Sequence, residues 1–183
     1  MKRLLGLLIL SMALLMPAAS FASSTTLNLD GTQSSWAESE LKQAYSYGLS
    51  YPGVMSSYKK EITREEFSTL AVKLYEGLSG NKAVAGTNPF TDTRNTEVLK
   101  AYKLKIINGK SPTGFYPYDK ITRQEIAVMI TRTLNASGIS TKVTSTSFPF
   151  TDKGQVSSWA LDAMQFVYSN GIMKGIDSSR IGP

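Results

Sequence analysis

The feature that most constrains this chain is a helix start that occurs twice, about 60 residues apart. It reads Ile-Thr-Arg-Glu-Glu-Phe at residues 62–67 and Ile-Thr-Arg-Gln-Glu-Ile at residues 121–126. Self-similarity at a regular spacing indicates a fold that is built from repeated units. The sequence therefore predicts a row of similar units.

Each motif carries the signals that begin a helix. Thr63 and Thr122 are the expected N-caps, and the glutamate three residues later completes a capping box. The arginine at the first helical position, Arg64 or Arg123, lies at the positive end of the helix dipole, which mildly disfavours a cation. A compensating anion is therefore expected, either a carboxylate of the protein, such as Glu65, Asp92 or Asp152, or an anionic ligand. From spacing alone, the ion pair within the protein is favoured.

Further motifs divide the chain into units. We predict a signal peptide at residues 1–22 and a linker at 23–33, followed by three units at residues 34–78, 89–137 and 148–183. Phe-Thr-Asp opens the second and third units, ending at Asp92 and Asp152, and Ser-Trp-Ala places Trp36 and Trp159 in the first and third. The third unit stops before its Thr-Arg helix is due, so we expect it to be incomplete.

The hydrophobic pattern predicts an all-α fold with long connecting loops. Helices are expected from Ser35 to Gly48, from Thr63, from Glu97 to Leu104 and from Thr122, because apolar residues recur there at helical spacing. Ser35 and Glu38 are expected to form a capping box. Alternating hydrophobicity is scarce, so strands are at most minor.

The N-terminal residues resemble a secretory signal peptide. Lys2 and Arg3 precede a 13-residue apolar run, and a small-x-small cleavage site follows at residues 20–22. Without these two cations, 18 basic and 14 acidic residues remain, a net charge of +4. The cations are scattered, which argues against nucleic acid as a partner. No second apolar run follows, so no membrane association is expected after cleavage.

Composition also limits the chemistry. The chain has no histidine and no cysteine, which removes His-based acid–base catalysis, thiol nucleophiles, disulfides and the usual zinc ligands. No pair of carboxylates stands out as a glycosidase pair. We therefore predict no catalytic residues, no metal and no cofactor, and a binding protein rather than an enzyme within this chain.

Several motif residues have an ordinary structural interpretation beside a functional one. Trp36 and Trp159 at helix starts are more often core residues than sugar platforms. Asp92 and Asp152 are more often turn or cap residues than ligand contacts. Gly109 and Gly175 are expected in turns, although a glycine also permits close approach of a ligand.

In this order and spacing, the motifs resemble S-layer homology domains. The pattern is Phe-x-Asp, Trp-Ala, Gly-Ile-x-x-Gly, Phe-x-Pro and Thr-Arg-x-Glu, and it covers nearly all of residues 23–183. The first unit lacks the Phe-x-Asp opening, and the second has no tryptophan and has Lys105 where glycine is usual. The resemblance implies an all-helical pseudo-trimeric bundle, here with an incomplete third unit.

The resemblance also implies a function. Such domains anchor exported proteins non-covalently to anionic, pyruvylated secondary cell-wall polysaccharides of bacteria, so a secreted, cell-surface location is expected. It points to Arg64 and Arg123 as contacts of the polymer anion, ahead of a plain ion pair. It also implies a groove lined by Trp36, Asp92, Gly109, Asp152, Trp159 and Gly175. The alternatives are the targeting part of a secreted hydrolase whose catalytic domain lies outside this chain, and a structural protein that assembles with copies of itself.

Overall fold

The structure is a computed structural model that describes residues 27, 29–145 and 147–183. The predicted signal peptide lies outside the described residues. The described part contains five α-helices: α2 (Glu38–Ser46), α3 (Arg64–Ser79), α4 (Thr96–Lys103), α5 (Arg123–Ala136) and α6 (Leu161–Ser169). Four 3₁₀ turns complete it: η1 (Ser35–Ala37), η2 (Pro52–Val54), η3 (Lys153–Gln155) and η4 (Ser158–Ala160). No strand occurs in this part, and the predicted all-α class is confirmed.

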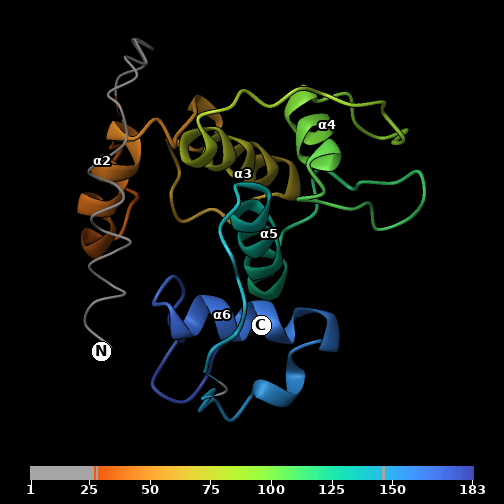
Figure 1. The fold of residues 1–183 in the computed structure, drawn as a ribbon. Helices are drawn as coiled ribbons and strands as arrows, with labels where there is room; N and C mark the ends of the chain where they lie inside the picture. Colours follow the sequence, from red (N-terminus) through yellow and green to blue (C-terminus); the bar gives the residue numbers. More distant parts are fainter. Residues whose placement is uncertain (1–26, 28, 146) are drawn as a thin grey trace.

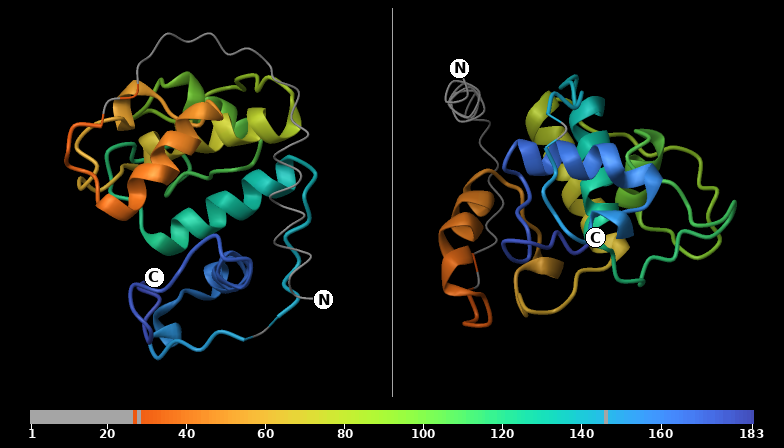
Figure 2. Two further views of the ribbon diagram at one scale, coloured as in Figure 1. Left: turned by 90° about the vertical axis from the view of Figure 1, so that its left-hand side faces the viewer. Right: turned by 90° about the horizontal axis from the view of Figure 1, so that it is seen from below.

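Helix α5 lies at the centre of the arrangement. It packs against α3 on one side and against α6 on the other, and α3 also packs against α4 (Figure 1). The left view in Figure 2 shows the same order, with α5 between the α3–α4 pair and α6. The helix of the second unit therefore joins the first and third units.

Two apolar cores follow from this order. The first lies between α3, α4 and α5, and its fully buried residues include Val98, Ile106 and Phe115. The second lies between α5 and α6 and includes Met164 and Ile181. Neighbouring residues of α5 serve both, because Met129 enters the first core and Val128 the second. Helix α5 is thus packed into both cores and holds adjacent units together.

The capping boxes predicted for the two repeated helices are confirmed. The Thr63 hydroxyl accepts from the Glu66 N–H at 3.2 Å, and the Glu66 carboxylate accepts from the Thr63 N–H at 2.7 Å. The Thr122 and Glu125 groups make the same two bonds. Each box satisfies two backbone groups at the helix start and so fixes where the first-turn arginine lies.

The first helix differs from the prediction. Ser35 belongs to the 3₁₀ turn η1, and neither η1 nor α2 has a side-chain cap bond, so the predicted Ser35–Glu38 box is wrong. No residue of α2 is buried, and Figure 1 shows α2 set apart from α5. Leu41, Ala44 and Tyr45 are only partly buried. Their apolar periodicity is real, but too little of the fold lies against it to form a core.

One helix ending recurs in all three units. After α2, α4 and α6, the residue following the C-cap is in the left-handed conformation: Gly48 at φ 70°, Lys105 at φ 59° and Gly171 at φ 70°. Its N–H and the next N–H bond back to carbonyls of the last turn, as in a Schellman motif. The predicted stop at Gly48 is confirmed. The second unit is unusual because it uses a lysine at this position.

Within the described residues, no helix combines the length and apolar character that crossing a membrane requires.

Candidate functional site

The candidate residues of the second and third units gather around two matching loops. In the second unit, the Asp92 carboxylate accepts from the N–H groups of Phe115 and Tyr116 at 2.9 and 2.7 Å. In the third, the Asp152 carboxylate accepts from Ile181 and Gly182, each at 2.9 Å. Both aspartates therefore hold the loop that precedes the next helix start.

These bonds also set the acidity of the aspartates. Partial burial raises the pKa of Asp92, but the two backbone hydrogen bonds outweigh it, and the net shift is downward. The pKa of Asp152 is lowered first by the bond from Ile181. Both groups are therefore held as carboxylates whose oxygens already accept backbone N–H groups.

Arg64 reaches from the first unit into the loop of the second. Its Nε donates to the Phe115 carbonyl and one terminal nitrogen to the Asn108 carbonyl, both at 3.2 Å. Its other terminal nitrogen forms a 2.9 Å ion pair with Glu125, and its guanidinium lies 5.0 Å from the centre of the Phe115 ring. Arg64 is only 7% exposed. The Arg64 guanidinium is therefore largely enclosed by the protein, and its assignment as a contact of the polymer anion stays a prediction.

Arg123 makes the corresponding reach into the third unit, but with one partner fewer. Its Nε donates to the Ile181 carbonyl at 3.0 Å, and one terminal nitrogen donates to the Lys174 carbonyl. Among the described residues it has no ion pair, and its second terminal nitrogen has no hydrogen-bond partner. The residue is partly buried, and this burial lowers the pKa of its guanidinium. Arg123 is thus held against the loop of residues 174–182 by two backbone carbonyls.

The two motif glycines are required by the turns themselves. A Cβ on Gly109 would lie 2.5 Å from the Ser111 carbonyl oxygen and 2.8 Å from the Phe90 ring. A Cβ on Gly175 would lie 2.5 Å from the Asp177 carbonyl oxygen and similarly close to the Phe150 ring. Close packing of the protein against itself therefore explains both positions, as the turn interpretation predicts.

The two tryptophans are exposed, and the core interpretation is wrong for both. Trp36 in η1 is 75% exposed and Trp159 in η4 is 59% exposed. Among the described residues, neither indole has a hydrogen bond or a ring contact with the arginine–aspartate loops. Two large apolar rings on a surface are available for an external partner.

Asp30 is a site residue that the sequence analysis missed. Its carboxylate accepts from the Ser57 N–H at 2.7 Å, as Asp92 accepts from Tyr116. Ser57, like Tyr116, is a non-glycine residue with positive φ. Asp30 thus has the loop-holding role in the first unit. Spacing is the one sequence signal that indicates Asp30, because it precedes Asp92 by about the repeat period. The phenylalanine that accompanies the other two aspartates is absent.

Two cavities lie near these loops. One, of about 320 Å³, is lined by residues that include Glu65, Asp92, Arg94 and Tyr118. The other, of about 590 Å³, is lined by Tyr102, Lys103, Lys105, Asn108 and Arg132. Neither lining includes Arg64 or Arg123. Among the described residues, no group of acidic side chains could hold a metal ion.

The structure therefore forms two constellations. Arg64, Asp92 and Gly109 meet at the loop of residues 108–116. Arg123, Asp152 and Gly175 meet at the loop of residues 174–182. Trp159 lies in η4, which is joined to the start of α5 because the Ser157 N–H donates to the Gln124 side chain. The assignment of all eight residues to a ligand stays a prediction.

Comparison with known proteins provides an independent observation. The profile of the S-layer homology domain matches residues 89–127 and 149–183. An endoglucanase of Bacillus sp. (strain KSM-635) is 29% identical over 136 residues, which cover 68% of this chain and 14% of the relative. An amylopullulanase of Thermoanaerobacterium thermosulfurigenes is 32% identical over 111 residues, which cover 56% of this chain and 6% of the relative. The chain thus spans a small part of each relative's length.

Proposed function

Because residues 89–127 and 149–183 are S-layer homology domains, this chain is an S-layer homology domain protein, and we propose that it anchors an exported protein to a bacterial cell wall. The partner is an anionic secondary cell-wall polysaccharide, recognised through a carboxylate such as that of a pyruvylated sugar. The first unit, residues 34–78, lies outside the two matches, and its membership stays a prediction.

The observation that supports this proposal most is the guanidinium of Arg123. It is positioned by a capping box and by two carbonyl oxygens of the loop of residues 174–182. A guanidinium held in this way loses little entropy when it binds a carboxylate. Exposed Trp159 in the third unit offers a flat apolar surface for a sugar ring.

Arg64 has a different part in this proposal. Each of its three guanidinium nitrogens already donates to the protein, to Phe115, Glu125 and Asn108, and the residue is only 7% exposed, so little of it can meet a ligand. Its first contribution is to hold the second unit's loop against α3. Arg123 has the equivalent position in the next unit and is the second candidate for contact with the polymer.

The test is co-sedimentation of the purified protein with cell-wall sacculi. Arg123→Ala should reduce the bound fraction severalfold and leave the helical circular dichroism unchanged. Lys142→Ala, which removes a cation from the exposed connection after α5, is the matched control and should bind normally. Equal binding by the wild type, Arg123→Ala and Lys142→Ala would contradict the assignment of Arg123.

A second candidate function comes from the relatives. Both carry the names of polysaccharide-degrading enzymes, and the matched segments cover small fractions of them. This favours a role as the targeting part of a secreted glycosidase, with catalysis outside the residues described. A hydrolysis assay of the chain on wall glycan tests for catalysis within it. Release of sugar would contradict both candidates, because each places catalysis outside this chain.

A further inference from the structure

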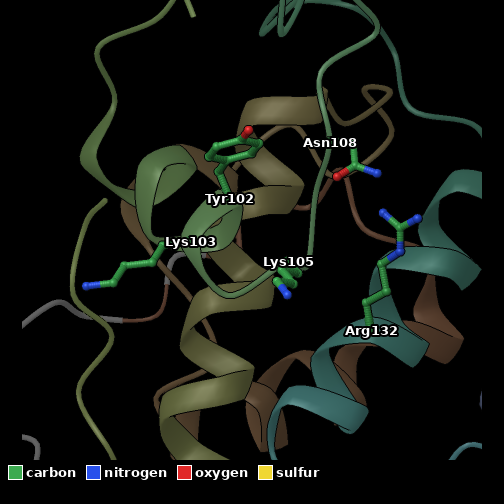
Figure 3. A pocket seen from close by; sticks show the side chains of 5 residues that line it. All are labelled: Tyr102, Lys103, Lys105, Asn108 and Arg132. Carbon is green, nitrogen blue, oxygen red and sulfur yellow. The ribbon is translucent and has the colours of Figure 1, made fainter. Parts of the chain in front are cut away.

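The larger cavity is lined by cations that the anchoring site does not use. Its lining of Tyr102, Lys103, Lys105, Asn108 and Arg132 contains three cations and no carboxylate. Figure 3 shows Arg132 extending from α5 toward Asn108, with Lys105 beside the end of α4, while Lys103 points away from them. The volume of about 590 Å³ is in the range of small-molecule sites.

The cations of this cavity are not neutralised by the protein. Among the described residues, the side chains of Lys103, Lys105 and Arg132 have no ion pair and no hydrogen bond. Surface cations are commonly scattered among anions, so a concave cluster of one sign raises the local concentration of counter-ions. The charge of this cavity therefore favours an anion.

The backbone at Lys105 supports a functional interpretation. Lys105 has φ 59° at a position where the first and third units use Gly48 and Gly171. A residue with a Cβ is disfavoured in this conformation, and such strain is retained mainly where a side chain is needed. The second unit therefore keeps a lysine where glycine would be more favourable.

The two lysines of the cluster are specific to the second unit. By repeat position, Lys103 and Lys105 correspond to Ser46 and Gly48 in the first unit and to Ser169 and Gly171 in the third. Arg132 corresponds to Lys73 of the first unit, so only the lysines fall outside the pattern shared by the units. It is distinct from the Arg64 and Arg123 positions, although Arg64 fixes the backbone of Asn108 by binding its carbonyl.

We propose that this cavity binds a phosphate group carried by a sugar or polyol. Arg132 offers a planar fork of donors, Lys105 a point charge and the Asn108 amide a neutral donor, a set that suits the oxygens of a dianion. The Tyr102 ring, held edge-on by Phe90 at 5.1 Å between ring centres, lies where a sugar ring can pack. The proposal goes beyond wall anchoring and does not depend on it.

The experiment is a titration of the purified protein at constant ionic strength, followed by NMR and calorimetry. The probes are inorganic phosphate, glycerol 1-phosphate and, for comparison, glucuronate. We expect saturable shifts at Lys105, Asn108 and Arg132 with both phosphates, and at least tenfold weaker binding of glucuronate. Arg132→Gln and Lys105→Gly should each weaken glycerol phosphate binding by about tenfold.

Two controls separate a binding role from a structural one. Lys153→Gln removes an exposed cation of η3 and should change the phosphate affinity by less than twofold. Lys105→Gly should melt at a higher temperature than the wild type while binding phosphate less well. Non-saturable shifts, an equal effect of Lys153→Gln, or equally tight binding of glucuronate would each overturn the proposal. Sacculi binding is not a readout here, so failure of the anchoring proposal would leave this result unaffected.

Discussion

Arg64 and Glu125 form a 2.9 Å ion pair across 61 residues of sequence. Both residues lie in the first turn of a repeated helix, Arg64 in α3 and Glu125 in α5. The second oxygen of Glu125 accepts the Thr122 N–H, so one carboxylate both caps its own helix and holds the arginine of the preceding unit. The repeated motif therefore connects neighbouring units as well as starting helices.

Arg64 has an ion pair and Arg123 has none among the described residues, so their removal should change the stability by different amounts. Arg64→Ala should lower the free energy of unfolding by roughly 3 kcal/mol, because it leaves a poorly exposed carboxylate without its partner. Arg123→Ala should cost less, roughly 1.5–2 kcal/mol, because it removes hydrogen bonds to carbonyls but breaks no ion pair. Urea unfolding followed by circular dichroism measures both. Equal losses would show that the Glu125 pair adds nothing.

The motif glycines predict a sharp steric contrast. Gly109→Ala and Gly175→Ala should each destabilise the protein by about 1–3 kcal/mol, because the new methyl group would overlap a backbone carbonyl. Gly154→Ala is the matched control, since no atom lies within 4 Å of its Cβ position and its φ is not positive. It should change the unfolding free energy by less than about 0.5 kcal/mol. Similar effects at all three positions would contradict the packing account.

The lysine at the end of α4 predicts a stabilising substitution. Lys105→Gly should raise the free energy of unfolding by about 1 kcal/mol, because glycine adopts the left-handed conformation without the Cβ penalty. Lys105→Ala removes the charge but retains the Cβ, and it should show no such gain. Thermal denaturation of the two variants side by side makes the comparison. A gain with alanine alone would assign the effect to charge rather than to backbone conformation.

The aspartates predict a loss of stability in acid. Hydrogen bonding lowers the pKa of Asp152, and that of Asp177 is lowered to about 2, first by the bond from the Ser179 N–H. A folded-state pKa below the unfolded value of about 3.9 stabilises the fold above roughly pH 5, and this contribution is lost as the pH falls through the folded-state pKa.

The melting temperature should therefore fall steadily between about pH 5 and pH 2. Asp152→Asn should flatten this dependence and lower the stability at neutral pH. Asp162→Asn, in the first turn of α6, makes the same change in charge in the same unit and serves as the control. An unchanged acid dependence of Asp152→Asn would show that its hydrogen bonds contribute nothing.

Local signals allowed much of the fold to be predicted. The Thr-Arg-x-Glu boxes and the glycine after α2 are determined within a few residues, and the structure has them where expected. The exposure of the tryptophans and of α2 could not be predicted, because it depends on which units pack against them. Residues spaced as a buried stripe remain partly exposed when no neighbour covers them.

Most residues of the candidate site could be predicted from the sequence, but the groups that they contact could not. Sequence spacing indicated Arg64 and Arg123 as equivalent, and each does reach into the next unit. The pairing of Glu125 with the arginine of the preceding unit is a long-range contact, which spacing within one motif does not contain. Asp30 was missed because its role is defined by the Ser57 backbone 27 residues away rather than by neighbouring letters.

The central claim is that the protein is retained by an anionic polymer of the wall. Its most direct test compares binding to sacculi before and after acid extraction of the secondary polysaccharide, with the extracted polymer added back as a soluble competitor. The account predicts that extraction abolishes binding and that the free polymer competes with intact sacculi. Binding that persists on extracted sacculi, with no competition by the polymer, would contradict it.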